Sequence, residues 1–141
     1  MAVLRAHREL QAQEAFGAAV RNYVAAEQSL ADTRARVAKY EADLFSGRRD
    51  RFSAADEARA LAAYRFECNA EVEAERAMIA ARETMNQRRA DYLEAHRKVE
   101  VVKRLEQDAR AEHRQVTMRE EQAEFDDFAS RRATRRALFP A

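Results

Sequence analysis

The chain has 141 residues, 36% of them charged, and its 26 Lys and Arg balance 25 Asp and Glu to a net charge of +1. This balance excludes a global field that would hold nucleic acid or an anionic membrane. The hydrophobic fraction of 47% includes 32 alanines, and Leu, Ile, Val and Phe total only 25, too few for a thick globular core. The composition is typical of a long helix or coiled coil with a thin seam.

A first helix is expected from about residue 4 to residue 45. Its apolar residues recur every seven positions, at Phe16, Tyr23, Leu30, Val37 and Leu44. This spacing predicts a coiled-coil seam. The complementary position, four residues further on, holds Val20, Glu27, Arg34 and Glu41, with small alanines such as Ala19 and Ala26 beside it. We therefore expect one firmly apolar seam position and one position that is wet or partly exposed, in a two-stranded pairing.

Residues 46–52 are expected to form a loop. Gly47 can adopt the left-handed conformation that ends a helix, and the charged residues 48–51 suit a solvated link. Ser53 is a candidate N-cap, and acidic residues in the next turn suit the positive end of the helix dipole. A second helix is therefore predicted to begin at residue 53.

The second helix is expected to run to about residue 136, because residues 53–136 contain neither glycine nor proline. Such a helix is about 120 Å long at 1.5 Å per residue. A short loop makes consecutive helices antiparallel neighbours. We predict one all-α domain over residues 1–141, an antiparallel coiled-coil hairpin whose second helix is the longer. The first helix can cover only residues near 54–95 of the second.

The apolar pattern of the second helix is less regular than that of the first. It advances in mixed steps through Leu61, Tyr64, Cys68, Val72, Ile79, Met85, Tyr92 and Val99, with Glu75, Arg82, Arg89 and His96 on core-like positions. Mixed steps predict local changes of supercoil. From Val99 onward we expect an apolar stripe that no part of the chain covers.

Residues for catalysis or metal binding do not form a recognisable pattern. Cys68 is the single cysteine, and His7, His96 and His113 are scattered. The carboxylate pair Asp126-Asp127 lies on an exposed helix. We expect neither an enzyme nor a bound cofactor or metal.

The ends of the chain bear on location and on nucleic-acid binding. Residues 1–20 do not resemble a signal peptide, and no apolar run of 18 residues is present, so we expect a cytoplasmic protein that does not insert into a membrane. The arginines of residues 131–136 could contact nucleic acid, but aromatic residues for base stacking do not interleave with them. We expect no nucleic-acid partner.

The segment from Arg97 to Arg132 resembles the C-terminal signature of the flagellar export protein FliJ family and, more loosely, of its injectisome counterparts. The shared elements are an arginine, an apolar-and-Glu cluster, an acid–Gln pair, an acidic pair and a closing arginine; they stand at Arg97, Val99, Glu100, Val102, Leu105, Glu121, Gln122, Asp126, Asp127 and Arg132. Three earlier features are also similar to the family: the heptads of the first helix, the glycine in the loop, and the serine that caps the start of the second helix. The chain departs from the family at its start, where only Ala2-Val3-Leu4 remains of an aromatic-apolar run.

The resemblance implies a non-enzymatic central stalk of a flagellar or type III export apparatus. Such a stalk inserts into the hexameric export ATPase ring, couples it to the membrane-bound export gate, escorts export chaperones and works in the cytoplasm beside the inner membrane. The implied ring contacts are Val99, Val102, Leu105, Phe125, Asp126, Asp127, Phe128 and Arg132. The implied gate contacts are Tyr40, Leu44, Tyr64 and Cys68, each of which is also a seam candidate.

Two other functions stay open at this point. A plain structural coiled coil would dimerise through the stripe at residues 99–130, without an ATPase partner. A nucleic-acid-binding protein would use the arginine tail and lose affinity steeply with salt.

Overall fold

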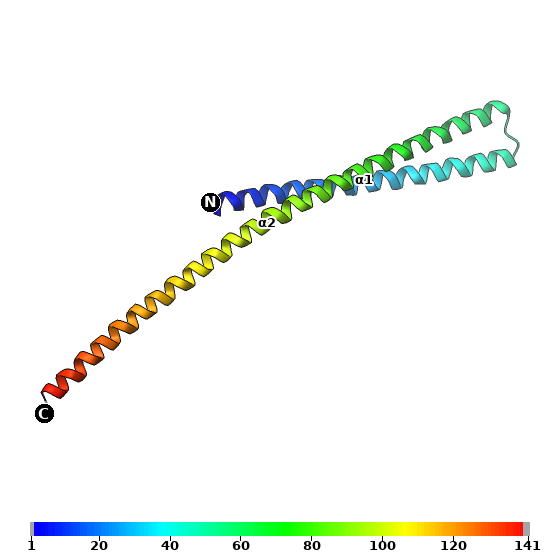
Figure 1. Cartoon of the computed structure of the whole chain (residues 1–141). Helices are drawn as coiled ribbons and strands as arrows, with labels where there is room; N and C mark the ends of the chain where they lie inside the picture. Colours follow the sequence, from blue (N-terminus) through cyan, green and yellow to red (C-terminus); the bar gives the residue numbers. More distant parts are fainter. Residues whose placement is uncertain (1, 140–141) are drawn as a thin grey trace. The chain divides into compact units, whose positions relative to one another are not determined.

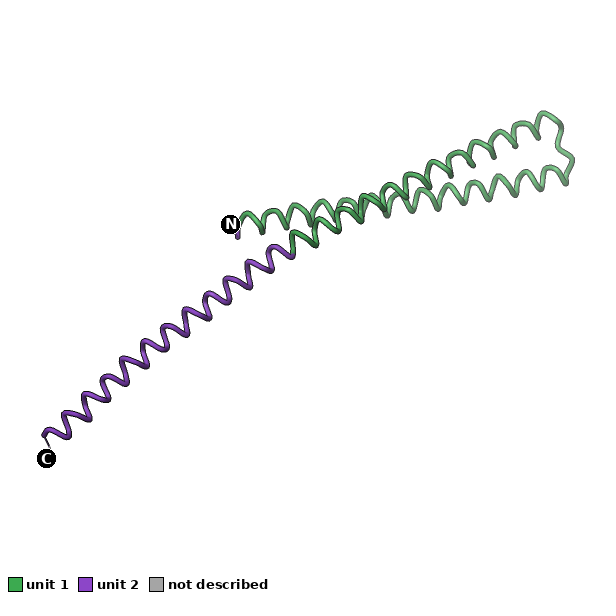
Figure 2. The backbone as a smooth tube through the Cα atoms, viewed as in Figure 1, with its two compact units in different colours: residues 1, 3–96 green, residues 2, 97–141 purple. Residues whose placement is uncertain are grey.

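The computed structural model describes residues 2–139 and contains two α-helices (Figure 1). Helix α1 spans Ala2–Arg49 and helix α2 spans Ala54–Leu138. The all-α helical hairpin predicted from the sequence is confirmed. The chain divides into unit 1, residues 3–96, and unit 2, Ala2 with residues 97–139 (Figure 2). A single-domain organisation stays a prediction, and each unit is described by itself below.

The turn between the helices is shorter than predicted. Because α1 continues to Arg49, Gly47 is a buried helical residue and not the end of the helix. The residue with positive φ is Arg51, at 65°. The N–H of Phe52 donates to the Gly47 carbonyl at 3.0 Å, which is the closing bond of a Schellman motif with Arg51 in the left-handed position. The prediction that Gly47 adopts the left-handed conformation was therefore wrong.

Gly47 is needed for a different reason, the close approach of Phe52. The Phe52 ring folds back onto the Gly47 backbone, and a Cβ at position 47 would fall inside that ring. The ring therefore acts as the hydrophobic contact that usually accompanies this helix ending. The glycine two residues before the end of α1 therefore leaves room for the Phe52 ring.

The start of α2 agrees with the sequence prediction. The Ser53 hydroxyl accepts a hydrogen bond from the N–H of Asp56 at 3.1 Å, as an N-cap does. Asp56 and Glu57 lie in the first turn, where the helix dipole favours negative charge. The helix ends at Leu138, two residues beyond the predicted end.

The inner face of α1 follows one of the two predicted seam positions. Phe16, Tyr23, Leu30, Val37 and Leu44 are all buried or half-buried, as predicted. The second position is three residues further on, not four, and it holds Ala12, Ala19, Ala26, Thr33, Tyr40 and Gly47. Glu27, Arg34 and Glu41 are exposed, which agrees with the wet or partly exposed character predicted for their position, but that position is not the second one of the inner seam. The seam combines large side chains at one position with mostly small ones at the other.

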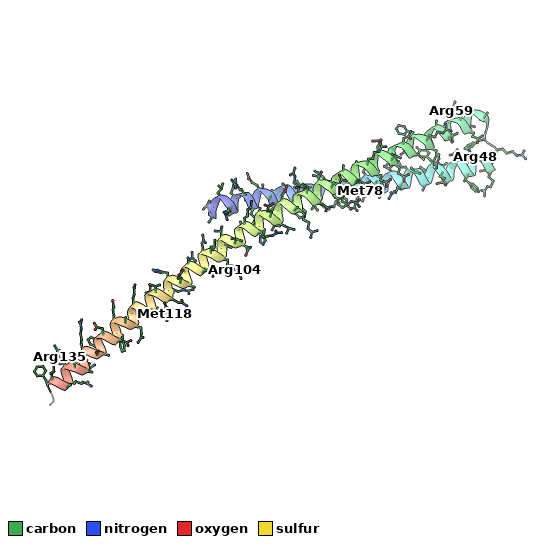
Figure 3. The ribbon with its side chains drawn as sticks, viewed as in Figure 1. Arg48, Arg59, Met78, Arg104, Met118 and Arg135 are labelled. Carbon is green, nitrogen blue, oxygen red and sulfur yellow. The ribbon has the colours of Figure 1, made fainter. Side chains whose placement is uncertain are left out.

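The inner face of α2 is more regular than predicted. Half-buried or buried side chains recur every seven residues at Tyr64, Glu71, Met78, Met85, Tyr92 and Val99. A second series with the same spacing holds Ala60, Glu67, Ala74, Ala81 and Ala95, and is interrupted by the exposed Arg88. Figure 3 labels Met78 where α2 runs beside α1. Val72 and Ile79 are exposed, and so are Glu75, Arg82 and Arg89. The predicted changes of supercoil rested on the mixed steps of the apolar residues and on polar residues at core-like positions, whereas the side chains that lie inward follow a seven-residue spacing.

Side-chain pairs between the helices confirm the antiparallel register of unit 1. Arg48 pairs with Glu57 beside the turn at 2.9 Å, Arg36 pairs with Glu67 at 3.1 Å, and Glu9 Oε1 lies 3.0 Å from His96 Nδ1. From Arg48 back to Glu9 in α1, the paired residue in α2 advances from Glu57 to His96, as it must between antiparallel helices. Next to His96, the Tyr92 ring stacks on Phe16 with 6.2 Å between ring centroids. The pairs therefore tie the two helices together along the whole of unit 1.

Candidate partner-binding surfaces

Unit 2 presents its α2 side chains to solvent. Every residue from 103 to 139 is exposed except Thr117, which is half-buried. The large apolar side chains among them include Leu105, Val116, Met118, Phe125, Phe128, Leu138 and Phe139. Figure 3 shows side chains of this segment, including Arg104, Met118 and Arg135, projecting from the helix. So much exposed apolar surface is characteristic of a site that binds another molecule.

The eight predicted ring-contact residues do not share one environment. Val99 is buried and Val102 is half-buried, whereas Leu105 and the five residues from Phe125 onward are exposed. The inner-seam heptad also ends here, because the positions that follow Val99 hold Glu106, His113 and Glu120. The exposed apolar residues beyond residue 116 therefore form a separate surface.

That surface is an aromatic stripe on one face of α2. Phe125 and Phe128 are three residues apart and Arg132 is four further on, so their side chains lie on the same side of the helix. Phe128, Arg132 and Phe139 line one surface depression. Met118 lies seven residues before Phe125, and Phe139 lies seven after Arg132. We call Met118, Phe125, Phe128, Arg132 and Phe139 the aromatic stripe; the sequence prediction missed its first and last members, although the seven-residue spacing could have revealed them.

The two predicted acidic contacts point elsewhere on the helix. Asp126 accepts a hydrogen bond from the Gln122 amide at 2.9 Å, and Asp127 pairs with Arg131 at 3.2 Å. Both partners are four residues away on α2 itself. Exposed pairs of this kind add little stability, so a competing partner can displace them at small cost.

The four predicted gate contacts lie in the hairpin seam of unit 1. Leu44 is buried, and Tyr40, Tyr64 and Cys68 are half-buried. A hydrogen bond with the Cys68 thiol raises the pKa of the Tyr64 phenol. The exposed aromatic residues of the same region are Phe45 and Phe66. Contact of the four residues with a gate protein stays a prediction.

Residues 2–139 offer neither a metal-binding cluster nor a membrane-spanning helix. Within that range no three or more His, Cys, Asp or Glu side chains are grouped so as to hold a metal ion. Neither described helix contains a stretch long and apolar enough to cross a membrane.

The chain matches a known protein family over nearly its whole length. The family model described as flagellar FliJ protein matches residues 2–138. The chain belongs to the FliJ family. Curated proteins and solved structures gave no significant match.

Family membership makes the chain a component of flagellar protein export. The match covers both helices and both units. The resemblance seen at residues 97–132 is thus part of a similarity over nearly the whole chain.

Proposed function

We propose that this FliJ-family chain is the non-enzymatic central stalk of the flagellar export ATPase, and that unit 2 inserts into the hexameric ring. One observation carries the proposal: every member of the aromatic stripe is exposed, with Phe125 and Phe128 each 65% accessible on a helix that is otherwise highly charged. Burying two such rings in a partner would contribute several kcal/mol. A ring pore would supply the surface that covers them.

The charges around the stripe suit a binding site with a fixed orientation. Arg132 lies beside Phe125 and Phe128, and Asp126 and Asp127 flank them on the other sides of the helix. Charged residues around an apolar centre steer association and fix its register more than they add affinity. The exposed Leu105 would extend the proposed ring contact to lower residue numbers. Val99 is buried and Val102 is half-buried, so neither would be among the first residues to touch the ring.

Further partners are proposed for unit 1. We propose that unit 1 contacts the cytoplasmic domain of the membrane export gate and escorts unloaded export chaperones, beside the inner membrane. Since Leu44 and Tyr64 hold the hairpin together, a gate protein would reach first the exposed rings of Phe45 and Phe66. Tyr40 and Cys68, both half-buried, would be reached only at their exposed edges.

The ATPase proposal is tested by replacing the aromatic stripe. The Phe125→Ala/Phe128→Ala variant is mixed with the cognate export ATPase, and ATP hydrolysis and ring formation are measured against the wild-type chain. We expect wild type to stimulate both and the variant to need at least about tenfold more protein, because truncating central aromatic contacts typically costs more than 1 kcal/mol each. The matched control is Phe45→Ala/Phe66→Ala, which removes two equally exposed rings from unit 1.

Two results would contradict the proposal. One is no change in hydrolysis or ring formation at saturating wild-type protein. The other is an equal loss for both double variants, which would place the contact outside the aromatic stripe. If the chain were instead a plain dimeric coiled coil joined through residues 99–130, Phe125→Ala/Phe128→Ala would abolish dimers without affecting the ATPase.

A further inference from the structure

Helix α1 carries a second apolar seam on the face opposite its inner seam. Its members advance in alternating steps of three and four residues, from Val24 and Gln28 through Ala31, Ala35, Ala38 and Ala42 to Phe45. All of them are exposed, and Val24 and Phe45 are among the most exposed apolar residues of unit 1. We call residues 24–45 of this face the outer seam. Its 3–4 spacing is that of a coiled-coil contact.

Charged residues flank the outer seam in a definite order. On one side stand Glu27, Arg34, Glu41 and Arg48, each seven residues after the last, with alternating sign. On the other side stand Asp32 and Lys39, again seven residues apart and of opposite sign. Charges at such flanking positions determine which helix pairs with a coiled-coil seam, and in which direction.

We propose that the outer seam is covered by the outer seam of a second copy of this chain, in an antiparallel pairing of the two α1 helices. Ala35 then lies opposite Ala38 of the second copy, and Ala31 lies opposite Ala42. Phe45 closes each end of the seam by packing against the aliphatic part of Gln28. The small alanine layers let the two helices approach closely, so Phe45 supplies most of the apolar area at either end.

The flanking charges select this register. In antiparallel helices, each flank of the seam meets the same flank of the other copy. Arg34 then meets Glu41, Glu27 meets Arg48 and Asp32 meets Lys39, and two-fold symmetry forms each pair twice. Every close flanking pair of ionised residues is therefore of opposite charge.

Other arrangements bring like charges together. Sliding one copy by one heptad places Arg34 against Arg34, or Glu41 against Glu41. A parallel, in-register pairing places Glu27 against Asp32 and Arg34 against Lys39. Since like charges oppose association, complementarity argues for one direction and one register of a self-pair. The inference concerns unit 1 and does not depend on insertion of unit 2 into an ATPase ring.

The test uses Asp32 and Lys39, because Arg34 and Arg48 also pair with Glu71 and Glu57 of the opposite helix inside the hairpin. Asp32 accepts a hydrogen bond from Gln28, which lies on its own helix. In Asp32→Lys, and equally in Lys39→Asp, both of the 32–39 pairs of a dimer carry like charges. When the two variants are mixed, each chain supplies the charge that the other lacks. The control is Asp43→Lys, an exposed change of the same size one residue before the inward-facing Leu44.

The measurement is sedimentation equilibrium of each full-length chain at low salt over a wide concentration range, without ATPase. We expect a wild-type dimer, at least about tenfold weaker dimerisation in each single variant, and recovery as a heterodimer in the equimolar mixture. The control is expected to dimerise like wild type. Circular dichroism of each variant establishes that the helices are retained.

Three outcomes would overturn the inference. The first is a wild-type monomer at every concentration. The second is a mixture that dimerises no better than the single variants. The third is a dimer that survives these changes and is lost in Phe125→Ala/Phe128→Ala, which would place self-association on unit 2 instead.

Discussion

Two stretches of the same helix, residues 57–95 and 103–138 of α2, differ sharply in burial. The first has an uninterrupted heptad of half-buried residues that pack in the hairpin, and the second is exposed at all but one residue. Their apolar residues also follow different faces, because Glu106, His113 and Glu120 occupy the continuation of the inner seam. Unit 2 is therefore not a simple continuation of the hairpin seam without a covering helix. It carries an apolar face of its own.

The largest difference between the units should be seen in the free energy of unfolding. Leu30 is 4% exposed, and Leu30→Ala should lower the free energy of unfolding of unit 1 by about 2–3 kcal/mol through lost burial and a cavity. Phe128→Ala, which removes a larger side chain from unit 2, should change it by less than about 0.5 kcal/mol. Urea unfolding followed by circular dichroism measures both. Equal losses would show that Phe128 is packed against protein in the free chain.

The turn of unit 1 should be the next most sensitive point. Gly47→Ala places a Cβ in the Phe52 ring and should destabilise the hairpin by about 1–3 kcal/mol, although alanine favours helix. The double variant Gly47→Ala/Phe52→Ala should regain part of that loss, which a thermal unfolding series would detect. A stabilising Gly47→Ala would contradict the packing of Phe52 on position 47.

A smaller effect is expected from the ion pair in the inner seam. Arg36 donates to Glu67, whose side chain is only 12% exposed, and also to the Thr33 hydroxyl at 3.1 Å. Arg36→Ala should cost about 1 kcal/mol, because it leaves a largely buried carboxylate without its partner. Arg131→Ala breaks the exposed pair with Asp127 in unit 2 and should be nearly neutral. Similar losses in the two variants would refute a difference in burial between these pairs.

The smallest effect concerns a tyrosine of the inner seam. A hydrogen bond with Glu27 raises the pKa of Tyr23 above its usual value of 10.0, while Arg82 lowers it. Because the folded pKa is the higher one, this contribution to stability is complete below pH 10 and is lost as the pH rises through the folded pKa. Ultraviolet titration should show Tyr23 ionising earlier in Glu27→Ala and later in Arg82→Ala. Shifts in the same direction would contradict the placement of Tyr23 between these two side chains.

The hairpin itself could be predicted from the sequence because its strongest signals are local. The seven-residue spacing of Phe16 to Leu44 identified one inner-seam position, and Ser53 identified the start of α2. The second seam position could not be chosen by hydrophobicity, since alanine, threonine and glycine fill it while Val20 competes for it. In α2, hydrophobicity also failed to identify the inner face. Val72 and Ile79 are exposed, whereas Met78 and several alanines and glutamates lie inward.

The candidate sites were predictable in part. Phe125, Phe128 and Arg132 lie together as the resemblance suggested, whereas Val99 and Leu44 are buried. A family signature marks residue types along the chain, but it does not say which face of a helix packs inward. That information depends on the opposing helix, and therefore on a register that only the folded hairpin defines.

The central claim is that unit 2 of the free chain is uncovered and that the export ATPase covers it. Amide hydrogen exchange of the full chain, with and without the ATPase, tests this directly. We predict slow exchange of residues 16–95 in both samples, and fast exchange of residues 116–139 that slows only when the ATPase is added. Slow exchange of residues 116–139 in the free chain, or exchange that the ATPase leaves unchanged, would contradict the claim.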